Sequence, residues 1–421
     1  MKPNQFWTAV SKVLAVMTAT LIIALILAPG ARAAGKYKIL HEFTGADGQS
    51  PMDALIFDGS GNLYGTTIYG GGGYAYGTVF KLTPNSDGSW TQSVLYSFSG
   101  GDGAFPFAGV IFDARGNLYG TTWWGGYFFC GAVYKLTPNL DGSWTESVLH
   151  SFNCSDGEGP VGGLVFDATG NLYGTATLGG AYGHGVVFKL APNPDGSWTD
   201  STIHDFKGGK DGRYPTHSDL IFDAAGNLYG VTAGLGWGDS NGTVFELTPN
   251  SDGTWTQSVL YNFRGGTDGT FPLGTLTFDR AGSLYGATLK GGAYGHGTIF
   301  KLTLGSDGKW TKYVLHQFRG GKDGSKPFAG VVFDTAGNLY GTTDTGGGVG
   351  SCSDGFKGCG TVFKLIPNSK GGWTEQMLHR FLGAPGREPI GGVVLDAAGN
   401  LYGTTSNEGF NYLGVVYEIT P

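Results

Sequence analysis

A block of about 55 residues recurs seven times along this chain, and its clearest marker is the run Gly-Asn-Leu-Tyr-Gly at 61–65. The marker returns around Asn117, Asn171, Asn227, Ser283 (where Ser replaces Asn), Asn338 and Asn400. A fixed period of this length indicates one supersecondary unit that is copied and stacked, because a single copy cannot bury its own apolar face. The repeat therefore restricts the possible folds more than any other feature of the chain.

The second copy contains four short β-favouring runs separated by turn signals. We expect strands over 108–112, 117–122, 131–136 and 144–152. Asp113 to Gly116 and Asn139 to Gly142 have the composition of tight turns. In the last strand the two-residue period predicts that Val148, His150 and Phe152 share one face. Four antiparallel strands per copy are typical of one blade of a β-propeller, an all-β fold.

The two ends of the chain decide the number of blades. The last copy supplies strands over 393–396, 400–405 and 414–420 and then stops at Pro421. Residues 36–43 supply the missing piece, since 39–43 align with 148–152. We therefore expect a seven-bladed propeller over 34–421, with repeats starting near 53, 108, 162, 218, 274, 329 and 391. The N-terminal strand should join the C-terminal blade and close the ring, which removes open sheet edges.

Residues 1–33 have the anatomy of a secretory signal peptide. Lys2 and Lys12 precede an apolar run over 13–28, and Ala31-Arg32-Ala33 offers small residues at the cleavage positions. An uncleaved N-terminal anchor is the alternative. Cleavage takes away Lys2, Lys12 and Arg32 and no acid, so the formal net charge moves from −7 to −10. We expect a secreted monomer without a transmembrane anchor, and mild acidity excludes nucleic acid as a partner.

The repeat resembles the GloVer tandem-repeat family of exported bacterial proteins. The resemblance rests on Phe57 to Thr67 with Gly77 to Pro84, and on Phe333 to Thr343 with Gly360 to Pro367. It implies an extracellular protein, although family members carry C-terminal sorting segments and this chain ends in a strand. It supplies no catalytic residues. The first two strands also resemble NHL-type propeller repeats, which implies that Val110 to Phe112 and its equivalents line the central channel.

Most histidines and tryptophans of the chain recur at one position of the repeat. The recurrent histidines alternate with Tyr96 and Tyr261, which indicates an aromatic framework position, not a general base. These histidines are His41, His150, His204, His316 and His379. The recurrent tryptophans are Trp90, Trp144, Trp198, Trp255, Trp310 and Trp373. Outside the leader, Trp123, Trp124 and Trp237 remain, and all three fall in loops between second and third strands.

These loops should share one face of the disc with the fourth-to-first connections. This face varies between copies, and variable loops on a rigid scaffold are the usual site of binding. The candidate ligand-binding residues are Trp123, Trp124, Tyr127, Phe129, Tyr182, His184, Trp237, Tyr294, His296, Phe410 and Tyr412. Their rings could stack on sugars or on a partner protein, or pack on one another to stiffen the loops.

The four cysteines also fall in these connections. None forms a Cys-x-x-Cys pair, which argues against zinc or redox chemistry. Cys130 and Cys154 lie in two connections of one blade, and Cys352 and Cys359 lie within the longest loop. If these connections share a face, the disulfides are Cys130–Cys154 and Cys352–Cys359.

A repeated acid precedes Gly in the fourth-to-first loops. These acids are Asp47, Asp102, Asp156, Asp211, Asp268 and Asp323. Calcium is one interpretation, but each loop offers few oxygens, so the turn interpretation is favoured and we predict no metal or cofactor.

The leading functional hypothesis is a non-catalytic exported propeller that binds a glycan or a protein. One alternative is a polysaccharide lyase or hydrolase at the channel mouth, using acids such as Asp239, Asp344, Asp354 or Glu408 with His184 and His296. The other alternative is a purely structural surface protein.

Overall fold

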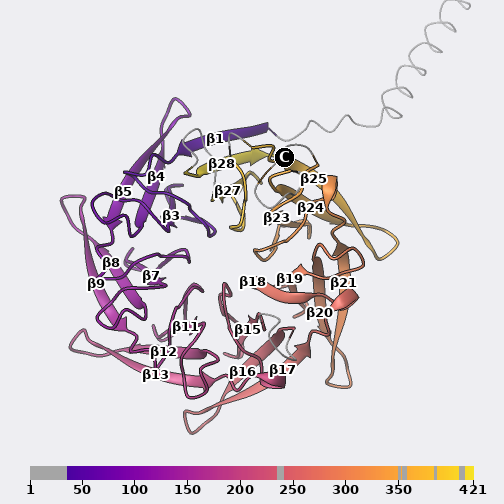
Figure 1. The fold of residues 1–421 in the computed structure, drawn as a ribbon, viewed down its shortest axis with the longest axis horizontal. Helices are drawn as coiled ribbons and strands as arrows, with labels where there is room; N and C mark the ends of the chain where they lie inside the picture. The colour runs from indigo at the N-terminus through magenta and orange to yellow at the C-terminus, as the bar shows by residue number, and fades with distance from the viewer. Residues whose placement is uncertain (1–35, 235–240, 349–351, 353–357, 384–385, 407–412) are drawn as a thin grey trace, which may run out of the picture.

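The computed structural model describes residues 36–421 except 235–240, 349–351, 353–357, 384–385 and 407–412. Seven four-stranded antiparallel sheets surround one central axis (Figure 1). This confirms the predicted all-β, seven-bladed propeller. Three single-turn 3-10 helices lie between blades, η1 (Gly209–Asp211), η2 (Gly266–Asp268) and η3 (Gly321–Asp323). No helix in the described part of the chain is long and apolar enough to cross a bilayer.

Each blade uses its strands in the same order from the axis outward. The first strands are β2 (Ile56–Phe57), β6 (Ile111–Phe112), β10 (Val165–Phe166), β14 (Ile221–Phe222), β18 (Thr270–Phe278), β22 (Val332–Phe333) and β26 (Val394–Leu395). The second strands are β3 (Leu63–Thr67), β7 (Leu118–Thr122), β11 (Leu172–Ala176), β15 (Leu228–Thr232), β19 (Leu284–Lys290), β23 (Leu339–Thr343) and β27 (Leu401–Thr405). The third strands are β4 (Thr78–Pro84), β8 (Ala132–Pro138), β12 (Val186–Pro192), β16 (Thr243–Pro249), β20 (Thr298–Leu304), β24 (Thr361–Pro367) and β28 (Val415–Thr420). The outer strands are β5 (Trp90–Ser97), β9 (Trp144–Ser151), β13 (Trp198–Asp205), β17 (Trp255–Asn262), β21 (Trp310–Gln317), β25 (Trp373–Arg380) and β1 (Lys36–Glu42). We number the blades 1 to 7 from β2–β5 onward.

The N-terminal strand closes the ring, as predicted. β1 lies on the outside of β28 and pairs with it from Lys36 opposite Thr420 to Glu42 opposite Val415 (Figure 1). Blade 7 therefore contains both ends of the described chain, in the sheet order β1-β28-β27-β26. Closure satisfies the edge hydrogen bonds that an open array would leave exposed.

The repeated marker folds as a turn built on one carboxylate. Asp113 Oδ1 accepts from the backbone nitrogens of Arg115 and Asn117, and its Oδ2 accepts from the Asn117 side chain and the Tyr119 hydroxyl. Gly116 has a φ of 83°, which favours glycine. The later glycine has another role, because a Cβ on Gly174 would lie 2.5 Å from the Phe188 ring. The marker thus sets both the turn and the space for a buried ring.

Two details of the strands differ from the sequence prediction. The first strand of blade 2 is only Ile111–Phe112, because the Ala108 carbonyl accepts from the Thr66 hydroxyl of the neighbouring blade, not from a ladder partner. The prediction that Val148 shares a face with His150 and Phe152 is wrong. A β-bulge shifts the register opposite Val133 and Tyr134, so Val148 is 40% exposed while His150 packs on Phe152.

Candidate functional site

The second-to-third loops and the fourth-to-first loops do share one face of the disc. Residues of the two loop types form isolated bridges in several blades, including Gln49 with Tyr69 and Ala104 with Trp124. Both predicted disulfides are present, Cys130–Cys154 with a Cα–Cα distance of 5.3 Å and Cys352–Cys359 with 5.4 Å. We call this side the loop face.

Aromatic side chains of blades 1 and 2 form a continuous surface on the loop face. Tyr76 contacts Phe105 and Trp124, with ring centroids 5.6 and 6.2 Å apart. Trp124 contacts Phe129 at 5.1 Å. Phe105 also contacts Trp123. We call this surface the aromatic band; the rings joined by these contacts are Tyr69, Tyr74, Tyr76, Phe105, Phe107, Trp123, Trp124 and Phe129. We include in it Tyr127 and Phe128 of the same loop, which contact each other.

The aromatic band is exposed and uncharged. Tyr127 is 80% exposed, Tyr74 70% and Phe129 54%. Residues 68–77 and 123–131, which supply most of the band, contain no Asp, Glu, Lys or Arg. An exposed apolar patch of this kind marks a surface that meets a ligand or partner, since isolated monomers rarely leave one. The predicted residues Trp123, Trp124, Tyr127 and Phe129 all lie in it.

The other predicted aromatic residues lie in separate blades. The His184 ring packs on Gly208, where a Cβ would lie only 2.9 Å from the ring. The Lys207 amine lies 6.0 Å from the centre of the Tyr182 ring. His296 packs on Gly320 in the same manner, and its Nδ1 lies 2.9 Å from the Ser325 hydroxyl.

Tyr294 has a cationic neighbour, Arg319, 5.4 Å away. Blades 3 and 5 thus use equivalent side chains in local contacts, apart from the aromatic band. Trp237, Phe410 and Tyr412 lie outside the described residues.

The aromatic band leads to a cavity on the propeller axis. Trp123 contacts Phe107 at 5.7 Å, Phe107 contacts His217 at 5.8 Å, and His217 contacts Phe328 at 4.9 Å. These last three residues, from blades 2, 4 and 6, line a cavity of about 230 Å³. Asp53 and Asp219 also line it, and its remaining walls come largely from blades 5 to 7, in β18, β22 and β26 and the residues just before them. Of Val110 to Phe112 and its equivalents, which we expected to line the channel, those of blades 5 to 7 line this cavity, whereas Val110 to Phe112 do not.

The two carboxyl groups are held by backbone amides and one hydroxyl. Asp53 accepts from the nitrogens of Ala54 and Gly109 at 2.7 and 2.5 Å. Asp219 accepts from the Gly163 nitrogen at 2.5 Å and from the Thr275 hydroxyl at 2.8 Å. Burial, reinforced by the negative charge of Asp219, raises the pKa of Asp53 to about 7.

His217 is the third ionisable group of the cavity. Burial lowers the pKa of its imidazole to about 4, so the ring is neutral at pH 7. Among the described residues, no hydrogen bond or ion pair engages this imidazole, whose neighbours are the Phe107 and Phe328 rings. It therefore keeps one donor and one acceptor available inside the cavity.

Sequence reasoning missed the cavity residues, although the repeat contains a signal for them. Just ahead of the first strand most copies carry an apolar residue, as at Met52, Val161 and Ile390, and His217 breaks this pattern. The next two positions hold small residues in the other copies, so Asp53 and Asp219 also stand out. The repeated Asp-Gly in the fourth-to-first loops predicts turns there, so the sequence does not single out Phe105 and Phe107.

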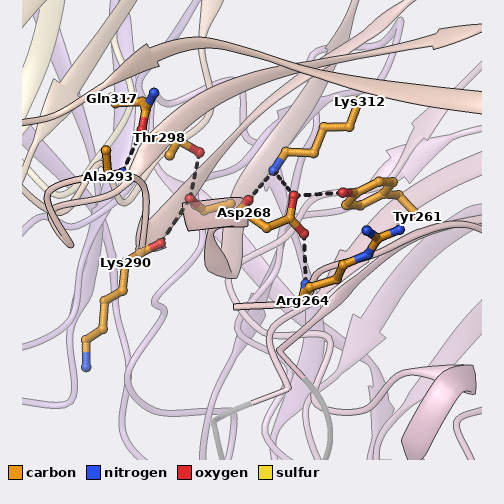
Figure 2. Close-up of polar contacts among 9 residues, drawn as sticks. Tyr261, Arg264, Asp268, Lys290, Ala293, Thr298, Lys312 and Gln317 are labelled. Atoms are coloured by element: carbon orange, nitrogen blue, oxygen red, sulfur yellow. Dashed lines mark hydrogen bonds and ion pairs between the residues drawn. The ribbon is translucent and has the colours of Figure 1, made fainter. Parts of the chain in front are cut away.

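The repeated loop acids serve turns and seams between blades. Figure 2 shows the seam between blades 4 and 5, where Asp268 accepts from the Arg264 nitrogen, the Tyr261 hydroxyl and the Lys312 amine. Six of the seven seams join a His or Tyr of one outer strand, a loop acid, and a residue of the next outer strand. Between blades 6 and 7, Tyr37 of β1 stacks directly on His379 of β25. Two described seams could hold a cation with one nitrogen and two carboxylates, His150 with Asp156 and Asp200, and His316 with Asp323 and Glu375.

The acids considered for an enzyme do not converge in the described structure. Asp344 lies 3.7 Å from the Lys326 amine. Asp239, Asp354 and Glu408 lie outside the described residues. The acids that line the axial cavity are Asp53 and Asp219, which sequence reasoning did not select.

The protein is a closed β-propeller with an aromatic loop face and an axial cavity. Its family is shown by comparison of its sequence with known protein families. Matches to the Gloeobacter/Verrucomicrobia repeat span residues 30–236, 125–352 and 218–421. The chain therefore belongs to this repeat family, in agreement with the GloVer resemblance. No curated protein is significantly similar to it.

Two solved structures are similar to the chain at low identity. A gluconolactonase from Xanthomonas campestris is 16% identical with a TM-score of 0.41, and the alignment covers 74% of this chain and 88% of that chain. A putative oxidoreductase (glucose dehydrogenase) from Thermus thermophilus is 18% identical with a TM-score of 0.44, covering 79% of this chain and 100% of that chain.

Proposed function

We propose that this protein is an exported propeller scaffold that binds a glycan on the aromatic band. The observation that carries the proposal is the unbroken series of ring contacts from Tyr74 to Phe129, exposed on one face. Flat aromatic faces stack on the apolar faces of sugar rings, and rings that already support one another are held in place for this. Residues 68–77 and 123–131, which supply most of the band, carry no charged side chain, and this favours an uncharged, ring-shaped ligand over an ionic one. The disulfides agree with an oxidising compartment outside the cytoplasm.

The hydrogen bonds of the axial acids favour binding over hydrolysis. Hydrolysis of a glycosidic bond requires an acid and a base that are free to exchange protons with the substrate. Each oxygen of Asp53 and Asp219 already accepts one hydrogen bond; three of these bonds come from a neighbouring blade and the fourth from the adjacent Ala54 nitrogen. One observation nevertheless supports a hydrolase as the second candidate, because Asp53 has a pKa of about 7 beside a second carboxyl group in a cavity.

The test compares matched aromatic substitutions in a glycan-binding assay. Trp123→Ala and Phe129→Ala each remove an exposed ring of the band, while Tyr182→Ala and Tyr294→Ala remove similarly exposed rings outside it. We expect the first pair to weaken glycan binding by roughly tenfold per ring, corresponding to about 1.4 kcal/mol. The control pair should leave affinity unchanged, with thermal unfolding confirming that all four variants fold.

Two outcomes would contradict the proposal. Equal losses in both pairs would show that the aromatic band has no special role. Release of reducing sugar by the wild-type protein, abolished in Asp53→Asn, would establish the hydrolase instead.

A further inference from the structure

The two acids of the axial cavity are additional to what the propeller framework uses. Neighbouring blades are tied by a threonine hydroxyl of one second strand and a carbonyl of the next blade, as from Thr121 to Gly162 at 3.0 Å and from Thr342 to Gly391 at 3.0 Å. The equivalents of Asp53 are Ala108, Gly162, Ser218, Gly274, Ala329 and Gly391, and those of Asp219 are Ala54, Gly109, Gly163, Thr275, Gly330 and Gly392. Most blades therefore close without an acid at either position.

The charges of the cavity are complementary to a cation. Among the described residues that line it, none is a lysine or an arginine. Each carboxylate oxygen can accept more than the one bond it receives from the protein. Two carboxyl groups that face one void repel each other unless a proton or a cation lies between them. A bound cation would remove this repulsion.

The remaining walls favour a ring-shaped ligand with hydroxyl groups. Phe107 and Phe328 flank the neutral imidazole of His217, which has a donor and an acceptor to offer. The volume of about 230 Å³ is below that of sites for drug-sized molecules. It therefore suits one terminal unit of a chain, with the preceding units outside. The contact of Phe107 with Trp123 makes the aromatic band continuous with the cavity wall.

We propose that the axial cavity binds a terminal amino sugar, whose protonated amine pairs with Asp53 and Asp219 while the sugars before it lie on the aromatic band. This inference rests on the proposed function, because it specifies the glycan that the band would hold. His217 contacts a sugar hydroxyl. Binding involves no covalent step.

The experiment uses three tetrasaccharides that differ only at the second carbon of each sugar. Titration calorimetry at about pH 5.5, where the sugar amines and Asp53 are both protonated, compares β-1,4-linked glucosamine, N-acetylglucosamine and glucose oligomers with the wild-type chain. We expect the amine oligomer to bind at least tenfold more tightly than the other two. Its binding should also release protons, measurable in buffers of different ionisation enthalpy, because the amine displaces the proton on Asp53.

Two variants keep the inference testable. In Asp53→Asn with Asp219→Asn, the preference for the amine oligomer should disappear. His217→Ala removes a side chain that supports no other polar group, so it should fold even if the double variant does not, and it should weaken the amine oligomer at least fivefold.

The outcomes separate the two proposals. Equal affinity for all three oligomers, sensitive to Trp123→Ala, would overturn the amino-sugar inference and leave the aromatic band as the glycan site. A preference for the amine that survives in both variants would also overturn the inference. No binding of any oligomer would contradict both proposals together.

Discussion

Two seams of the propeller use the same framework with opposite charges. Between blades 1 and 2, the Tyr96 hydroxyl donates to Asp102 at 2.5 Å, and the residue of the next outer strand at this seam is Glu146. Between blades 4 and 5, the Tyr261 hydroxyl donates to Asp268 at 2.7 Å, and the residue of the next outer strand is Lys312 (Figure 2). The Lys312 amine contacts both the backbone oxygen and the carboxylate of Asp268.

The repeat therefore places three side chains together at each of these seams, but it does not determine whether their charges balance. Lys312 neutralises Asp268 with a cation that the chain itself supplies. Glu146 cannot do this for Asp102, and one of its oxygens is buried without a hydrogen bond. Burial and the charge of Asp102 therefore raise the pKa of Glu146 to about 7. The first seam depends on a proton where the second has an ammonium group.

The largest effect should follow removal of the cation from the second seam. Lys312→Met keeps the apolar stem but leaves Asp268 without its ion pair, so we expect the free energy of unfolding to fall by roughly 2–3 kcal/mol. Urea titration measures this change. The control is Lys312→Gln, because Gln257 donates to the backbone oxygen of Asp211 in the equivalent place at 2.9 Å. Gln should lose about half as much, because it keeps the hydrogen bond to the backbone oxygen but not the charge; a Gln variant as stable as the wild type would show that charge balance is unimportant there.

A smaller effect, dependent on pH, should follow removal of the acid from the first seam. The folded chain holds the Glu146 proton up to about pH 7, whereas the unfolded chain releases it near the ordinary pKa of 4.5. Stability therefore falls as the pH rises from about 4.5 to 7. Glu146→Gln should be more stable than the wild type at pH 8 by about 1–2 kcal/mol, after allowing for partial exposure, and equal to it at pH 4. Thermal unfolding across this range would contradict the prediction if the difference did not change with pH.

The smallest effect compares the two tyrosine hydroxyls. Tyr96→Phe removes the side-chain donor of Asp102 and leaves only the Ser99 nitrogen. Tyr261→Phe leaves Asp268 with the Lys312 amine. We expect losses of about 1 kcal/mol for Tyr96→Phe and about half that for Tyr261→Phe. The reverse order in chemical denaturation would show that Lys312 does not compensate for the missing hydroxyl.

The sequence predicted the fold well because the repeat supplies its own controls. Seven copies of the Asp-x-x-Gly turn, six of them followed by Asn and one by Ser283, fix where second strands begin. The alignment of 39–43 with 148–152 identifies the closing strand. The disulfide pairs followed from loop topology alone. The failures were local: the bulge at Val133 and the shortened first strand depend on contacts with neighbouring strands and blades, which no single copy reveals.

The candidate site was only partly predictable. Trp123, Trp124, Tyr127 and Phe129 were selected because they depart from the repeat. The same criterion selected Tyr182 and Tyr294, which lie in other blades and contact cations of their own. Composition identifies exposed rings, but it does not say which rings from different loops meet.

Periodicity and turn chemistry, both readable in the amino-acid sequence, predict the ring of seven blades, its closure and the side on which the loops gather. Which loop rings form one surface, and that Asp53, His217 and Asp219 face one cavity, emerges from the folded structure. These residues come from blades 1 and 4, and their proximity arises from circular closure, which brings residues far apart in the chain to a common axis.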